Sequence, residues 1–158
     1  MSTQDRAEPF VAAVLMTLRE MAGVEAMAQE MSRATGPDGF GDLSAVLRLS
    51  GIGEGYLILS FPNQTARLLA VRVLDGAAPL DDDLVRDCAG EVANVVTGQA
   101  KALLAGTPNS FTFSTPTVVV GPPVVPAGEW WVVGFVSEVG PFRLHLCQSG
   151  YGAESVES

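Results

Sequence analysis

The sequence is poor in charged residues, and above all in basic ones. Charged side chains make up 17% of the 158 residues, and 18 acidic residues against 9 basic ones give a net charge of −9. A surface this acidic repels phosphate backbones and anionic lipid headgroups, which argues against nucleic acid and membranes as partners. It suits a partner with a basic face. Hydrophobic residues, at 47%, are numerous enough to build a core, so a disordered chain is also excluded.

Cysteine, histidine and long apolar runs are also scarce. Cys88 and Cys147 are the only cysteines, and the N-terminus MSTQDRAEPF has no signal-peptide character, so a reducing, cytoplasmic location is expected. The longest apolar run, residues 56–61, is far too short to span a bilayer. His145 is the only histidine, and its alternating surroundings predict a surface or edge position rather than catalysis. No Cys–His or Ser–His–Asp arrangement is visible, so a covalent mechanism is not expected.

The hydrophobic pattern predicts one α+β domain over residues 1–158, with a core over about 8–148 and a frayed tail over 149–158. Apolar residues at helical spacing predict helices over residues 7–22, 64–74 and 80–105. Asn63 is the expected cap of the second helix. Strand patterns cover residues 43–50, 55–61, 110–120, 130–139 and 142–148. Because each half of the chain has a helix followed by strands, the order indicates an internal repeat.

Two stretches allow more than one interpretation. Residues 24–33 have the propensity of a helix, whereas the break at Gly23 and the alternation of their apolar residues allow a strand. The stretch GIGEG between the strands 43–50 and 55–61 has the spacing of a nucleotide-binding loop. Because no helix follows it directly and it contains no lysine, a hairpin turn is favoured.

The long helix carries poor helix formers in the stretch GEVANVVTGQAK, residues 90–101, where a glycine costs about 1 kcal/mol relative to alanine. At about 100° per residue, one arc of the helix is apolar and is expected to face the core. Its members are Leu84, Val85, Cys88, Val92, Val95, Val96, Ala102 and Leu103. Cys88 is therefore expected to be a packed thiol rather than a reactive one.

Glu91, Asn94 and Gly98 fall outside this arc, on the same strip of the helix as Asp83 and Asp87. Along the strip lie two aspartates and a glutamate, then an asparagine, and then a glycine, which has no side chain. Taken alone, a Glu-x-x-Asn pair is most often a solvated helix face. On the first helix, the positions with the same phase hold a threonine and a glutamate, so one candidate site per chain is expected.

Four segments, in this order, resemble the CheX-like members of the CheC/CheX/FliY family, which are phosphatases of chemotaxis response regulators. They are PFVAAVLMTLREMAGVE, LSGIGEGYLILSFPNQTA, GEVANVVTGQAKALLAG with the motif E-x-x-N-x-x-x-G-x-A-K, and STPTVVVG. The resemblance covers residues 8–148. It implies a CheC-like α+β fold, in which an antiparallel sheet packs against long helices in a helix-plus-strands pseudo-repeat. It also favours a strand over residues 24–33 and implies a homodimer.

The resemblance implies a substrate, the aspartyl phosphate of a CheY-like receiver domain, and carries the catalytic pair over onto Glu91 and Asn94. Asn94 would position the attacking water, and Glu91 would anchor a lysine of the receiver. Asp83 and Asp87 would steer the receiver, and Gly98 would let one of its loops approach. The resemblance places any Mg²⁺ on the receiver, so no metal or cofactor site is expected in this chain. The alternative is a non-catalytic adaptor that binds a receiver or a flagellar or signalling component through the same helix face.

One position departs from the family's pattern. The family often has asparagine where this sequence has Gln99, and because Gln99 has a phase near the apolar arc, a packing consequence is expected rather than lost chemistry.

Overall fold

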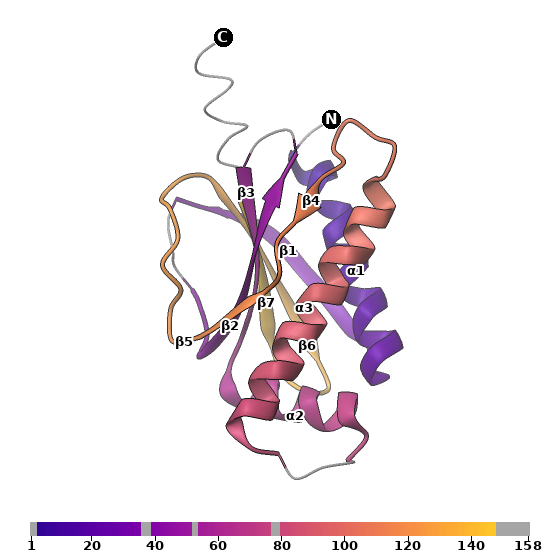
Figure 1. Cartoon of the computed structure of the whole chain (residues 1–158), viewed down its shortest axis with the longest axis vertical. Helices are drawn as coiled ribbons and strands as arrows, with labels where there is room; N and C mark the ends of the chain where they lie inside the picture. Colours follow the sequence, from indigo (N-terminus) through magenta and orange to yellow (C-terminus); the bar gives the residue numbers. More distant parts are fainter. Residues whose placement is uncertain (1–2, 36–38, 52–53, 77–79, 148–158) are drawn as a thin grey trace.

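Figure 1 shows the computed structural model of the chain, in which residues 3–35, 39–51, 54–76 and 80–147 are described. An antiparallel sheet carries a layer of helices on one face, so the predicted α+β class is confirmed. The elements are α1 (Thr3–Ala22), β1 (Ala26–Ala34), β2 (Leu43–Ser50), β3 (Glu54–Phe61), α2 (Asn63–Leu74), α3 (Asp82–Leu104), β4 (Thr112–Phe113), β5 (Thr117–Val120), β6 (Trp130–Ser137) and β7 (Phe142–Cys147). Among the described residues, no helix has the length and apolar character needed to cross a membrane.

The strand order confirms the internal repeat. The sheet runs β1-β6-β7-β3-β2, with the short strands β4 and β5 both paired to the free side of β2. With β5 included, the order is β1-β6-β7-β3-β2-β5. Swapping β1 with β5, β2 with β6 and β3 with β7 gives the same order in reverse. The two copies are therefore α1 with β1 to β3 and α3 with β4 to β7, and their last strands, β3 and β7, pair at the centre.

The larger core lies between the sheet and the helices. Alternate residues of each strand point into it, as Leu57, Leu59 and Phe61 of β3 do, and they pack against buried residues of all three helices. A smaller cluster lies on the opposite face, where Ile58, Trp130 and Cys147 are buried. Trp130 and its neighbour in β6 point to opposite faces, as expected, and the second tryptophan is half-buried on the helix side.

The surface position expected for His145 is wrong. The side chain is 1% exposed, and its ring lies 4.3 Å from that of Phe40, measured between centroids. Alternation in β7 places it on the face opposite the helices, and that face is covered by the segment that holds Phe40. Burial, together with the nearby Arg143, lowers the pKa of His145 from 6.5 to about 4, because the charged imidazolium is poorly solvated there. Its Nε2 has no hydrogen-bond partner among the described residues.

Several predictions about element ends need correction. The segment with two interpretations is a strand, β1, with a bulge between Ala28 and Met31. Asn63 is not the cap of α2: Pro62 precedes the helix, and Asp42 Oδ2 accepts a hydrogen bond from the backbone N–H of Asn63 at 2.9 Å. Residues 52–53 of the expected hairpin turn and the tail 149–158 lie outside the described residues, but the strands that the turn joins do pair antiparallel.

The expected strand over residues 110–120 is interrupted. Phe113 pairs with Leu49 and Thr117 with Val46, so residues 114–116 lie opposite only residues 47 and 48. The extra residue makes a bulge between β4 and β5. A proline in the bulge reinforces the break, because proline has no N–H to donate to the neighbouring strand.

Candidate functional site

Helix α3 is buried on a wider arc than its apolar residues predict. The Asp81 side chain caps it by accepting a hydrogen bond from the N–H of Leu84 at 2.8 Å. Cys88 is buried, as expected, but Val95 is only half-buried and Leu103 is 47% exposed. The buried positions are Val85, Cys88, Ala89, Gly90, Val92, Ala93, Val96, Thr97, Ala100 and Leu104. Many are small residues, which let α3 pack closely against α1 and the sheet but add little to a hydrophobic pattern.

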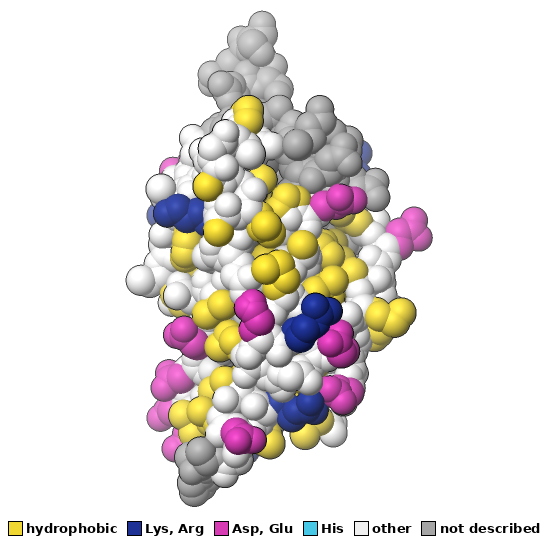
Figure 2. All heavy atoms as spheres, turned by 90° about the vertical axis from the view of Figure 1, so that its right-hand side faces the viewer, with side chains coloured by type: hydrophobic (Ala, Val, Ile, Leu, Met, Phe, Trp, Pro, Cys, Tyr) yellow, Lys and Arg dark blue, Asp and Glu magenta, His cyan; other side chains and the backbone are white. Residues whose placement is uncertain are grey.

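The five residues of the predicted strip all lie outside the core. Asp83, Asp87 and Glu91 are exposed, whereas Asn94 and Gly98 are half-buried. Figure 2 looks at the helix layer, and acidic side chains gather at its lower left, where the N-terminal half of α3 lies. The strip is therefore accessible from solvent.

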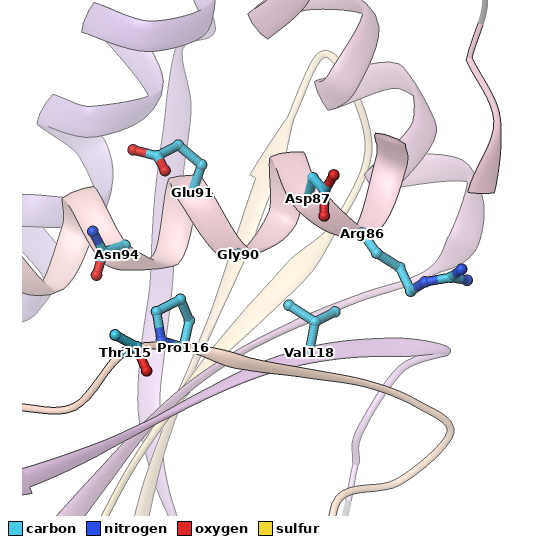
Figure 3. A pocket seen from close by; sticks show the side chains of 8 residues that line it. All are labelled: Arg86, Asp87, Gly90, Glu91, Asn94, Thr115, Pro116 and Val118. Atoms are coloured by element: carbon cyan, nitrogen blue, oxygen red, sulfur yellow. The ribbon is translucent and has the colours of Figure 1, made fainter. Parts of the chain in front are cut away.

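A groove of about 600 Å³ runs beside α3 (Figure 3). One wall is the helix, and the other is the bulge and the start of β5. Its lining residues are Arg86, Asp87, Gly90, Glu91, Asn94, Thr115, Pro116 and Val118. Three predicted site residues, Asp87, Glu91 and Asn94, thus meet in one groove, whereas Asp83 and Gly98 do not line it.

Gly90 allows the two walls to approach. A Cβ at this position would lie 3.1 Å from Cγ2 of Val118 and 3.9 Å from Cγ of Pro116, so a side chain here would push β5 away from the helix. This contact explains a glycine for which the sequence alone supplied no reason. Two sequence features could have pointed to it: a glycine in a helix interior, and a proline inside an expected strand.

The bulge is held in place by Ser114. Its backbone N–H donates to the carbonyl of Arg48 at 3.0 Å, and its Oγ accepts from the N–H of Arg48 at 2.9 Å. The next two residues, Thr115 and Pro116, project toward α3 and form the wall below Asn94 and Gly90 in Figure 3. Sequence reasoning missed this wall because it treated residues 110–120 as one continuous strand.

Gly98 lies beyond the groove, against β4. A Cβ there would be 3.9 Å from Cζ of Phe113, which is an ordinary contact. Gln99 faces α1: its Nε2 donates to Oγ1 of Thr17 at 3.2 Å and lies 3.5 Å from Oε1 of Glu20. The departure from the family's pattern is thus part of the packing between helices. On α1, the positions with the same phase as Glu91 and Asn94 differ: Thr17 is completely buried and only Glu20 is exposed, so α1 does not present a second pair to solvent.

The polar groups of the groove are available to a ligand. Within the described part of the chain, neither the Glu91 carboxylate nor the Asn94 carboxamide has a hydrogen-bond partner. Arg86 forms an ion pair with Asp83, one turn before it on the same helix. No group of three or more His, Cys, Asp or Glu side chains suited to a metal occurs among the residues described. The arrangement can bind a cationic group at Glu91 and hold a water molecule or a polar group at Asn94.

Known proteins with the same fold take part in chemotaxis. The family described as chemotaxis phosphatase CheX matches residues 43–127, whereas no curated protein matches the chain in sequence. A chemotaxis protein CheX from Desulfovibrio desulfuricans is 26% identical, covers 91% of this chain and 99% of its own, and superposes with a TM-score of 0.82. A putative chemotaxis protein from Desulfovibrio vulgaris Hildenborough is 29% identical, with coverages of 90% and 96% and a TM-score of 0.80.

A third structure shares the fold at lower identity. It is the complex of CheX with CheY, BeF3 and Mg²⁺ from Borrelia burgdorferi, 22% identical, with coverages of 89% and 95% and a TM-score of 0.71.

Proposed function

Because the chain belongs to the family of chemotaxis phosphatase CheX, we propose that it hydrolyses the aspartyl phosphate of a CheY-like receiver domain. The observation that carries the proposal is the groove lined by Glu91 and Asn94, which lie one helical turn apart on α3, beside the bare backbone of Gly90. In Figure 3 the Glu91 carboxylate points away from the wall formed by Thr115 and Pro116, where a partner can reach it. The Borrelia burgdorferi complex, which contains CheY with BeF3 and Mg²⁺, supports a receiver as the partner.

Asn94 positions the attacking water. An aspartyl phosphate is a mixed anhydride with a good leaving group, so hydrolysis mainly requires a water molecule held in line with the P–O bond that breaks. The water oxygen attacks phosphorus, the aspartate leaves as a carboxylate, and the water protons remain with the inorganic phosphate and solvent. A carboxamide suits this task because it both donates and accepts hydrogen bonds and, being neutral, does not repel the phosphoryl oxygens.

Glu91 anchors the receiver rather than taking part in the chemistry. A carboxylate next to a bare phosphoryl group would be repelled, whereas it can form an ion pair with a lysine beside the phosphorylation site. Such a pair fixes Asn94 against the phosphoryl group. The Mg²⁺ that neutralises the phosphoryl charge belongs to the receiver.

The other residues of the strip assist docking. Asp87 lies in the groove and adds negative charge that attracts a basic surface, which affects the association rate more than the affinity. Asp83 lies one turn further away and contributes less steering, because Arg86 partly neutralises it. Gly98 leaves α3 without a side chain one turn after Asn94, where a receiver loop can come close.

The family resemblance also implies a homodimer, and the scarcity of cysteine favours a cytoplasmic location. We include both in the proposal. Met27 of β1 and Val136 of β6 are cross-strand neighbours and are both exposed, so a second copy of the chain would have an apolar pair to cover there. Sedimentation of the purified protein at several concentrations measures the oligomeric state.

The lifetime of a receiver labelled with acetyl phosphate tests the proposal. The wild-type protein should shorten it, and Asn94→Ala should lower the rate by about a hundredfold or more. Asn63→Ala is the matched control, since this asparagine is exposed at the start of α2, away from the groove.

Hydrolysis by Asn94→Ala at the wild-type rate would sink the catalytic assignment. A wild-type protein that binds the phosphorylated receiver without shortening its lifetime would identify the adaptor instead.

A further inference from the structure

We propose that Arg86 is a specificity residue that binds a carboxylate of the receiver some distance from its phosphoryl group. The inference rests on the proposed function, because it names a second contact of the same groove. Arg86 is the one cationic side chain among the described residues that line the groove, where the other charged groups are Asp87 and Glu91.

The arginine is placed for recognition. Its side chain is 36% exposed, and in Figure 3 the guanidinium extends away from the helix, within reach of a partner. In the described part of the chain its single ion-pair partner is Asp83, which is 85% exposed and contacts one nitrogen, Nη2. A guanidinium has five N–H groups, so several donors remain for a carboxylate.

Arg86 is too far from Asn94 to share a phosphoryl group with it. The two residues are eight positions apart on α3, which is about 12 Å along the helix axis. In Figure 3 the guanidinium also points away from Asn94, toward the far end of the groove. An arginine that stabilises phosphoryl transfer has to contact the transferred group. Arg86 therefore binds the partner at a second point.

The partner group follows from charge. Asp87 and Glu91 attract a basic patch, and a receiver that offered only basic groups along this groove would place one of them against Arg86. That repulsion disfavours such a receiver. A receiver whose carboxylate and lysine are separated by about the axial rise from Arg86 to Glu91, which is five positions or about 7.5 Å, satisfies both residues. Arg86 thus selects among receivers that Glu91 and Asn94 alone would not distinguish.

The test measures binding and turnover separately. Binding uses a CheY-like receiver from the same organism, loaded with BeF3 and Mg²⁺, and turnover uses the same receiver labelled with acetyl phosphate. For Arg86→Ala we expect Kd and KM to rise about tenfold with kcat unchanged, and for Arg86→Glu a larger rise. In the Arg86→Glu background, changing exposed Asp and Glu residues of the receiver to Lys one at a time, apart from the phosphorylated aspartate and the carboxylates that hold Mg²⁺, should restore binding at one position.

Arg67→Ala is the matched control, since Arg67 also pairs with an aspartate of α3, Asp82, at 3.0 Å but lies outside the groove. It should leave Kd, KM and kcat unchanged. Thermal unfolding of each variant shows that the fold is retained.

Two results overturn the inference: Kd and KM of Arg86→Ala equal to those of Arg67→Ala, or a large loss of kcat with unchanged Kd, which would make Arg86 a catalytic group. Both leave the proposed function intact. A wild-type protein that binds no receiver instead refutes the proposed function, and this inference falls with it.

Discussion

The two faces of the sheet are both buried, but they are covered in different ways. On one face, three helices lay regular rows of apolar side chains over the strands and form one continuous core. On the other, the buried cluster of Ile58, Trp130 and Cys147 is covered by partly buried residues that include Phe40 and Val125 from irregular segments. The backbone hydrogen bonds of a helix are formed within the helix, so its outer surface can carry polar side chains. The candidate site lies on that outer surface.

The difference shows where each face tolerates polar groups. On the helix side, Glu91 and Asn94 line a groove, and both lie outside the buried core. On the opposite side, His145 is turned inward, and its Nε2 has no partner among the described residues. We therefore expect changes in the groove on the helix side to alter receiver dephosphorylation, and changes on the opposite side to alter stability alone.

The largest expected effect is that acid lowers the free energy of unfolding through His145, on the face of the sheet opposite the helices. Above pH 6.5, His145 is neutral in both the folded and the unfolded protein. As the pH falls below 6.5, the unfolded chain binds a proton that the folded protein, with its pKa of about 4, does not. The free energy of unfolding should therefore fall by about 3 kcal/mol between pH 7 and pH 4, as measured by urea denaturation.

His145→Phe keeps an aromatic ring against Phe40 and removes the titration. The elements packed around His145 present Arg143 on its own strand, Ile58 on β3, Val132 on β6 and Phe40. None of these neighbours is a carboxylate, so no other group in contact with His145 accounts for a pH dependence over this range. The variant should lose the pH dependence near pH 6 and hydrolyse receiver phosphate at the wild-type rate. An unchanged pH dependence would show that other groups cause it.

A side chain at Gly90 should close the groove from the helix side. Gly90→Val places a branched side chain where even a Cβ comes within 3.1 Å of Val118, so either β5 or α3 has to move. Such overpacking costs about 1–3 kcal/mol of unfolding free energy. Because Asn94 lies in the same groove, the dephosphorylation rate should fall about tenfold or more. Wild-type activity would show that the groove is not where the receiver docks.

Gly98→Ala tests a second glycine of the same helix, where an added Cβ has more room than at Gly90. The new methyl group would meet Phe113 at 3.9 Å without strain, and alanine is a better helix former than glycine, so the unfolding free energy should rise by about 0.5–1 kcal/mol. If a receiver loop approaches the helix here, KM should increase at the same time. A more stable protein with unchanged KM would show that Gly98 is not part of the docking surface.

Gln99→Asn should have the smallest effect. The shorter carboxamide no longer reaches Thr17 of α1, and losing one partly exposed hydrogen bond costs about 0.5–1 kcal/mol. Receiver dephosphorylation should be unchanged, because Gln99 faces the other helix. A large loss of activity would mean that contacts between α1 and α3 set the position of the catalytic helix.

The sequence predicted most of the fold because the strands alternate regularly and the helices carry apolar residues at helical spacing. It also placed Glu91 and Asn94 outside the core. It could not predict the second wall of the groove, since a three-residue segment opposite two residues of a neighbouring strand is a property of strand pairing. His145 was misplaced for a similar reason: alternation shows which side chains share a face, but not which segment from elsewhere covers it.

The bulge at residues 114–116 has a consequence for the protein's behaviour at high concentration. Without it, β4 and β5 would form one long outermost strand of Thr, Val and Phe with unpaired backbone groups, which is the kind of edge that recruits strands from other molecules into aggregates. The break leaves one piece of two residues and another of four, and a proline stands between them. The feature that builds a wall of the groove thereby also helps to keep neighbouring molecules from adding strands to this end of the sheet.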